Sequence, residues 1–205
     1  MCIRDRNYGF ENLKSFGDSR INKALENLST NRARLKWKSN STTIIFGSLL
    51  PAEINMMVKV IERYTDFNFL IAPHDIDKKH LEEVTSKLSS PVSFITEIKD
   101  NKIPNKILII NSLGDLKYLY PQANLAYVGG GFDKGPHSII EPLVYGTPTI
   151  IGPNIQHYPM ARELKKDGVL TVINNEEELP DAMNMLLSTT PESVSYTHLT
   201  LPTKA

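Results

Sequence analysis

Residues 125–148, LAYVGGGFDKGPHSIIEPLVYGTP, decide the fold of this 205-residue chain. An apolar run of strand length, Leu125–Val128, leads into three glycines, and a helical segment is predicted from near Ser138 to a tight turn. Consecutive glycines let the backbone come close to a ligand, and a helix start offers unpaired N–H groups and a positive dipole end. The stretch therefore predicts an anion site built from backbone at the end of a strand.

The same alternation of strand-length and helix-period segments runs through the chain from Thr42 onward. It predicts a Rossmann-like α/β domain, with a doubly wound parallel sheet. Two apolar stripes at helical spacing predict core-facing helices, namely Ile54, Met57, Val58 and Ile61, then Leu81, Val84 and Leu88. The predicted strands are Thr43–Phe46, Phe67–Ala72, Val92–Ile95, Lys106–Asn111, Leu125–Val128 and Thr149–Ile151, with Val169–Ile173 as an additional edge strand.

Composition excludes several classes of function. Lys+Arg and Asp+Glu both number 23, so no overall field draws the chain to nucleic acid or to an anionic membrane, and an anion site must be local. Cys2 is the only cysteine, which excludes disulfides, zinc clusters and cysteine nucleophiles together. No apolar run approaches the roughly 20 residues of a membrane-spanning helix.

Two other interpretations of the glycine stretch compete with an anion site. The Gly-x-Gly-x-x-Gly dinucleotide fingerprint does not fit, because the loop between the glycines and the helix is too long. Ser138 and Glu141 also match a capping box, in which Glu141 folds back on its own helix start. The glycines alone leave these two interpretations of the helix start, ligand site and cap, equally open.

The whole stretch resembles the donor-site motif of the bacterial 3-deoxy-D-manno-octulosonic acid (Kdo) transferases. The motif runs from glycines through His-Asn and Glu-Pro to Gly-x-Pro, and here it is matched by 129–131, His137-Ser138, Glu141-Pro142 and 146–148. Ser138 replaces the usual Asn. The resemblance implies the C-terminal half of a GT-B glycosyltransferase, with Glu141 holding the ribose of the nucleotide.

Other stretches resemble the same family in the same order. Ala72-Pro73-His74 resembles Ala-Pro-Arg-His without the arginine, whose charge His74, Lys78 or Lys79 would have to replace. Residues 111–116 resemble a Gly-Glu-Leu turn, although Asp115 alone is also a good helix cap. Gly47-Ser48, 152–154 and 17–20 match further family loops. The implied donor-binding residues are Pro73, His74, Leu113, Gly114, Asp115, Gly129, Gly130, Gly131, Lys134, His137, Ser138, Glu141 and Asn154.

The resemblance implies a reaction as well. Kdo would pass from CMP-Kdo to a lipid A precursor, an inverting and metal-independent step in lipopolysaccharide core biosynthesis on the cytoplasmic face of the inner membrane. The donor is a substrate, and the resemblance implies neither a cofactor nor a metal. The catalytic base and the acceptor site would lie in an absent N-terminal domain, so we expect this chain alone to be inactive. The alternatives are a GT-B domain for a UDP-sugar and an inert nucleotide-binding fragment.

The chain divides into four predicted segments. Residues 1–6 and 193–205 show no structural period and resemble translated adapter sequence from assembled environmental reads, so we expect non-native or disordered ends. Residues 7–40 are polar and predict a linker or a helical segment of a neighbouring domain. Residues 41–192 are predicted to form the Rossmann-like domain that binds CMP-Kdo.

Overall fold

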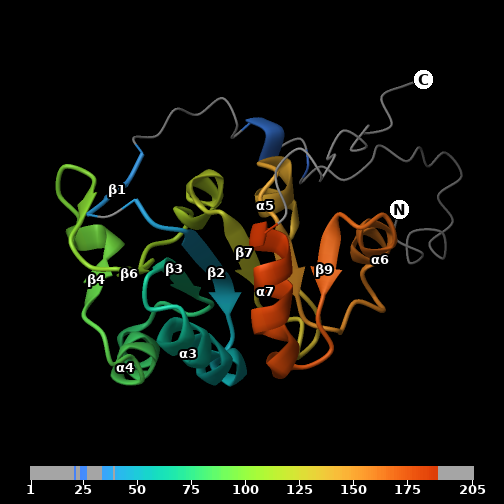
Figure 1. Cartoon of the computed structure of the whole chain (residues 1–205), viewed down its shortest axis with the longest axis horizontal. Coiled ribbons are helices and arrows are strands. Elements are labelled where there is room, and N and C mark those ends of the chain that lie inside the picture. Colours follow the sequence, from blue (N-terminus) through green and yellow to red (C-terminus); the bar gives the residue numbers. More distant parts are fainter. Residues whose placement is uncertain (1–20, 22–23, 27–33, 39, 189–205) are drawn as a thin grey trace, which may run out of the picture.

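The computed structural model describes residues 21, 24–26, 34–38 and 40–188 (Figure 1). The predicted non-native ends, 1–6 and 193–205, and the early motif at 17–20 lie outside the described residues. Of the predicted linker, the described part includes the short strand β1 (Lys36–Trp37), which pairs in parallel with β5 (Lys102–Ile103). This two-stranded sheet was not predicted, because two residues are too few to show a period.

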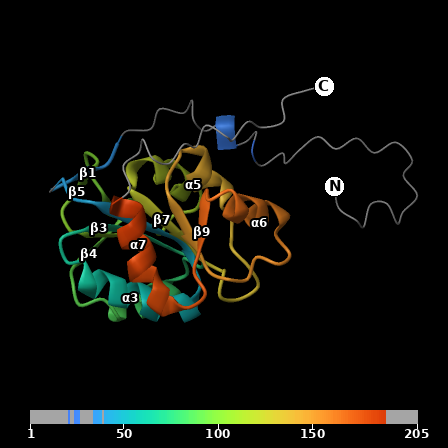
Figure 2. The same cartoon turned by 45° about the vertical axis from the view of Figure 1, so that its right-hand side comes forward.

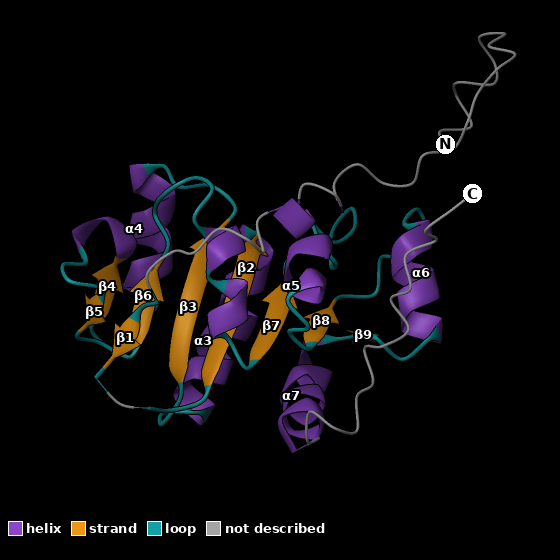
Figure 3. Ribbon diagram, turned by 90° about the horizontal axis from the view of Figure 1, so that it is seen from above, coloured by secondary structure: helices purple, strands orange, loops and turns teal. Residues whose placement is uncertain are grey.

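A seven-stranded sheet forms the centre of the domain, and all of its strand pairs are parallel. Figure 3 shows the strands in the order β4-β6-β3-β2-β7-β8-β9. All seven predicted strands are present, and the prediction of a parallel α/β fold is confirmed. Their bounds are β2 (Thr43–Leu49), β3 (Asn68–Pro73), β4 (Val92–Phe94), β6 (Ile107–Ile109), β7 (Leu125–Val128), β8 (Thr149–Ile151) and β9 (Leu170–Val172).

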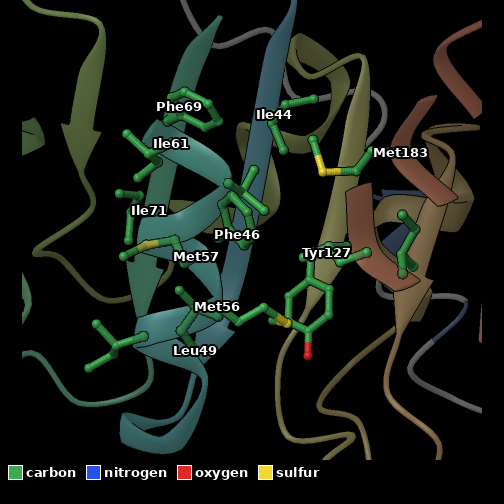
Figure 4. Packing of buried hydrophobic residues seen from close by; sticks show 14 of the residues in the cluster. Ile44, Phe46, Leu49, Met56, Met57, Ile61, Phe69, Ile71, Tyr127 and Met183 are labelled. Atoms are coloured by element: carbon green, nitrogen blue, oxygen red, sulfur yellow. The ribbon is translucent and has the colours of Figure 1, made fainter. Parts of the chain in front are cut away.

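The strands are apolar throughout because both faces of the sheet are covered. Successive side chains point to opposite faces, so Phe46 belongs to one buried cluster and its neighbour Ile45 to the other. The first cluster includes Met57 and Met183 from covering helices (Figure 4). The second includes Tyr120, which is 2% exposed.

Helices α3 (Ile54–Arg63), α4 (Lys78–Ser86) and α7 (Leu179–Ser188) pack on the first face, and Figure 1 shows α3 and α7 in front of the sheet. The other face is covered by 3₁₀ helices η3 (Leu116–Tyr118) and η4 (Tyr120–Gln122). Helix α5 (Ile140–Val144) packs in a third cluster, in which Leu143 lies with Val128 of β7 and Ile151 of β8. Helix α6 (Pro159–Lys166) lies beside β9 (Figure 2). The remaining 3₁₀ helices are η1 (Pro51–Glu53), η2 (Ile95–Glu97) and η5 (Glu176–Glu178). Within the described ranges, no helix is long and apolar enough to cross a bilayer.

The strand order reverses between β2 and β7. From β2 the chain first builds β3, β4 and β6 on one side, and it then returns to place β7 on the other side of β2. In open parallel sheets, ligands bind outside the carboxyl ends of the strands at such a reversal. The glycines at 129–131 follow β7 directly, so the fold places them at this point.

Candidate functional site

The glycine loop packs tightly against the end of β2. The Gly129 N–H donates to the Gly47 carbonyl at 2.8 Å. A Cβ on Gly129 would lie only 2.4 Å from the Ser48 carbonyl oxygen, so no larger residue fits without displacing backbone. The sequence therefore needs glycine here to bring the two strand ends together.

Hydrogen bonds within the loop fix its shape. The Gly130 carbonyl accepts from the amides of Asp133 and Gly135, both at 3.0 Å, and the Gly129 carbonyl accepts from the His137 amide at 3.0 Å. Gly130 has φ +92°, a left-handed conformation that glycine adopts without strain. Residues 129–137 therefore form a compact turn and not an extended loop.

Glu53, which sequence analysis did not single out, lies under this loop. Its carboxylate accepts from the Gly130 amide at 3.0 Å, from the Leu50 amide at 3.0 Å and from the Tyr127 hydroxyl at 2.7 Å. Burial, followed by the charge of Glu53, raises the pKa of Tyr127, so its hydroxyl remains a donor. An acidic residue just after a strand and before an apolar helix was the available signal, but it is also common at helix starts.

This contact corrects one part of the predicted anion site. The resemblance implied Gly130 as a donor-binding residue, but in this structure its amide donates to Glu53 and does not face a ligand phosphate. Four other amides of the stretch 129–138 have no acceptor within the described part of the chain. They are those of Gly131, Phe132, Lys134 and Ser138.

His74 and His137 come together although they belong to different βα units. Their rings stack with centroids 4.4 Å apart and planes inclined by 20°. His74 follows the buried Pro73 at the end of β3 and is exposed, and its amide donates to the Leu49 carbonyl at 2.8 Å. Burial, and then the neighbouring His74, lower the pKa of His137, whereas Glu53 acts in the opposite direction. The Nε2 atom of His137 is buried and has no hydrogen-bond partner among the described residues.

A second close approach joins the glycine loop to the loop after β8. A Cβ on Gly131 would lie 2.4 Å from the Gly152 nitrogen, so these two backbones touch. Asn154 fastens the same contact: its amide donates to the Gly131 carbonyl at 2.9 Å and its side chain donates to the Asp133 carbonyl at 2.7 Å. Asn154 thus braces the loop through its nitrogen atoms.

Helix α5 begins at Ile140, two residues later than predicted, and its N-cap residue makes no side-chain cap. The alternative capping box between Ser138 and Glu141 is therefore absent. Glu141 is half-buried, and among the described residues its carboxylate has no hydrogen-bond or ion-pair partner. Its charge, after the effect of burial, raises the pKa of Tyr120 and so marks the two side chains as neighbours.

The remaining predicted residues lie nearby in the fold but are less fixed. Leu113 and Gly114 follow β6, and Leu113 is 85% exposed while nothing surrounds the Cβ position of Gly114. Asp115 is the N-cap residue of η3 and accepts a hydrogen bond from the Ser112 hydroxyl. Lys134 is exposed on the glycine loop. The turn at Leu113–Asp115 therefore offers exposed, adaptable groups at the end of the neighbouring strand.

Two other features bear on where a ligand can sit. A hollow of about 690 Å³ lies at the edge strand β4, lined by Trp37, Phe94 and several lysines, and it includes none of the predicted site residues. The hollow is also lined by residues 102–105, which precede β6. It therefore lies away from the strand reversal, where the polar groups come together. Among the described residues, no three His, Cys, Asp or Glu side chains are grouped so that they could hold a metal ion.

Comparison with known proteins gives one consistent group of relatives. No protein-family model matches the chain. It is 30% identical over 191 residues to a 3-deoxy-D-manno-octulosonic acid transferase of Chlamydia muridarum, covering 90% of this chain and 44% of that protein. It is 29% identical over 155 residues to the enzyme of the same name from Aquifex aeolicus, covering 73% of this chain and 43% of the other. The chain thus spans less than half the length of these relatives.

Among solved structures, the fold is similar to the C-terminal CMP-Kdo binding domain of WaaA from Acinetobacter baumannii. The TM-score is 0.65 at 16% sequence identity, over 83% of this chain and 90% of that domain. Identity this low supports the fold alone. The likeness in fold extends over most of both chains.

Proposed function

This chain belongs to the bacterial 3-deoxy-D-manno-octulosonic acid transferases and has the fold of a C-terminal domain of that family, and on this premise we propose that it binds the donor CMP-Kdo. The cytidylate would lie at the carboxyl ends of β2, β3 and β7, where the strand order reverses. A second domain beyond this chain would bind the acceptor, a lipid A precursor, at the cytoplasmic face of the inner membrane.

One observation carries this proposal: the ring contact of 4.4 Å between His74 and His137. The resemblance to the family implied both residues from separate motifs, and the fold brings them into contact beside the glycine loop. Side chains that are distant in sequence but converge at a strand reversal are typical of a ligand site. The pair also supplies protonatable groups where the family's arginine is missing.

The groups at this site suit a phosphate that leaves with increasing negative charge. In the proposed reaction, an acceptor hydroxyl attacks the anomeric carbon of Kdo, the bond to the phosphate oxygen breaks, and CMP departs. The amides of Gly131, Phe132 and Lys134, which have no acceptor among the described residues, would stabilise that charge, because donors that are already fixed need no reorganisation. Glu141, whose carboxylate lacks a protein partner among the described residues, would accept from the ribose hydroxyls. The step would be inverting, and these groups need no metal for it.

Calorimetric titration of the chain with CMP and with UMP tests this proposal. We expect saturable heat with CMP and at least about tenfold weaker binding of UMP, a difference of about 1.4 kcal/mol. Preferential binding of UMP or UDP would instead support a GT-B domain for a UDP-sugar. A folded chain that binds no nucleotide would contradict the proposal and indicate an inert fragment.

A turnover assay with CMP-Kdo and a lipid A precursor tests whether the transfer reaction requires a second domain. The catalytic base is proposed to lie outside this chain, so we expect no product from the chain alone. Product formed by the chain alone would show that the base lies within residues 1–205.

A further inference from the structure

Glu53 is the one buried acidic residue among those that the structure describes, with 2% of its surface exposed. Burying a carboxylate costs free energy unless hydrogen bonds replace its water shell. Here three donors do so, from Leu50, Tyr127 and Gly130. Within the described ranges it forms no ion pair, so the hydrogen bonds alone keep the carboxylate in place.

Glu53 connects the two loops that border the strand reversal. It ends η1, which follows β2, whereas its partner Gly130 follows β7. Figure 4 shows the Tyr127 hydroxyl pointing away from the apolar cluster, toward this polar end of the strand. On its other side, the Cβ position of Gly130 is 3.0 Å from the His137 ring. Gly130 therefore lies between the carboxylate and the stacked histidines.

We propose that Glu53 is a positioning residue for donor binding: by holding the Gly130 amide, it sets residues 129–137 in the conformation that presents the remaining amides to the donor phosphate. This role rests on the proposed donor function. If the Gly130 amide were released, the turn could rotate about the flexible glycines, and the remaining amides would no longer be held in place.

The proposal distinguishes hydrogen-bond geometry from charge. A glutamine at position 53 can preserve the geometry, because its oxygen can accept from the Leu50 and Gly130 amides while its NH₂ donates to the Tyr127 oxygen. Aspartate keeps the charge, but it is one methylene shorter and cannot reach both loops. Glu53→Gln should therefore preserve donor binding, and Glu53→Asp should not.

The test is calorimetric titration with CMP of the wild-type chain and of the Glu53→Gln, Glu53→Asp and Glu62→Asp variants. Glu62 is an exposed acidic residue of α3, the helix that follows Glu53, and serves as the matched control. At a temperature at which circular dichroism shows every variant folded, we expect Glu53→Asp to bind about tenfold or more weakly. Glu53→Gln and Glu62→Asp should stay within about threefold of the wild type. A purely structural role would lower the melting temperature and leave the affinity of the folded protein unchanged.

Each other outcome is decisive. If wild type binds CMP and Glu53→Asp binds it equally well, or if Glu53→Gln loses as much as Glu53→Asp, the proposal is overturned. If Glu53→Asp does not fold, Glu53→Ala, which removes both acceptor oxygens, replaces it at a lower temperature, and unchanged CMP affinity in that variant overturns the proposal. If the wild type binds no CMP, the proposed function fails. The role of Glu53 is then tested by hydrogen exchange of the Gly130 amide. If this amide exchanges no faster in Glu53→Asp than in Glu62→Asp, the positioning role of Glu53 is overturned.

Discussion

The imidazole of His137 stacks on that of His74 at 4.4 Å, and this contact joins the glycine loop to the end of β3. Burial lowers the pKa of His137 because the charged imidazole loses its water shell. The neighbouring His74 lowers it further, because protonating both rings would place two positive charges side by side. His74 remains exposed, so the pair is open to solvent on one side. We therefore expect the contact to respond to pH and to an anion that approaches it.

The stability of the domain should decrease in acid because of this pair. The pKa of His137 is lower in the folded chain than its ordinary 6.5, so the unfolded chain binds more protons. The resulting stability is fully present above about 6.5 and is lost as the pH falls through the lowered pKa. We expect a smaller drop in melting temperature between pH 7.5 and pH 5 for His137→Gln than for wild type, measured by circular dichroism.

His157→Gln is the matched control, since His157 is exposed on the loop before α6. It should show the same drop in melting temperature as the wild type. An equal drop in His137→Gln would mean that other groups control the acid transition.

Donor binding should take up protons at the same pair. A phosphate placed beside the rings stabilises the protonated imidazole and so raises the pKa of His137 on binding. By linkage, CMP should bind more tightly as the pH falls from 8 to 6. Calorimetry in buffers of different ionisation heat should report net proton uptake, and His137→Gln should reduce it. Proton release, or none, in the wild type would place the phosphate away from the histidines.

Glu141 should contribute to affinity but little to stability. Its carboxylate has no partner among the described residues, so removing it breaks no protein hydrogen bond. In the proposed complex it accepts from the ribose, and a hydrogen bond to a charged group contributes about 1.5–3 kcal/mol. Glu141→Ala should therefore weaken CMP binding by roughly 10- to 150-fold without lowering the melting temperature.

Glu163→Ala on the exposed face of α6 is its control and should leave both quantities unchanged. A large loss of stability in Glu141→Ala, with unchanged affinity, would show that Glu141 supports α5 instead of binding the ribose.

The architecture was predictable from the sequence because the core strands are short, continuous apolar runs. Leu125–Val128 and Thr149–Ile151 have the predicted bounds, and β2 differs from prediction by extending to Leu49 through Gly47 and Ser48. Periodicity ends where apolar residues end, so polar or glycine residues that continue a strand are missed. Because the sheet is parallel, the predicted motifs that follow its strands all lie at the edge formed by the carboxyl ends of those strands.

The site was less predictable, because its contacts join residues that are distant in sequence. The bond between Glu53 and the Gly130 amide depends on β2 and β7 being neighbours, a fact of strand order rather than of local pattern. Asn154 was expected near the sugar, but its nitrogen atoms brace the loop, and its role toward a donor remains a prediction. Helix α5 begins late because the loop's own hydrogen bonds, up to the His137 amide, hold the chain in a turn.

The contact between Gly47 and Tyr120 offers a test of packing directly beneath the site. A Cβ on Gly47 would lie 2.3 Å from the Tyr120 hydroxyl oxygen but 3.3 Å from its ring carbon Cζ. Gly47→Ala should therefore lower the free energy of unfolding by about 1–3 kcal/mol, since overpacking a core costs this much. Phenylalanine lacks the oxygen that collides, so Gly47→Ala in a Tyr120→Phe background should cost at least about 0.5 kcal/mol less, as measured by a double-mutant cycle in urea.

Because the Gly47 carbonyl also accepts from the Gly129 amide at 2.8 Å, the single variant should disturb the glycine loop, and the double variant should restore it. Strict additivity of the two substitutions would mean that the hydroxyl does not limit the space at Gly47, and that the loop is placed by Glu53 and Asn154 without support from Tyr120.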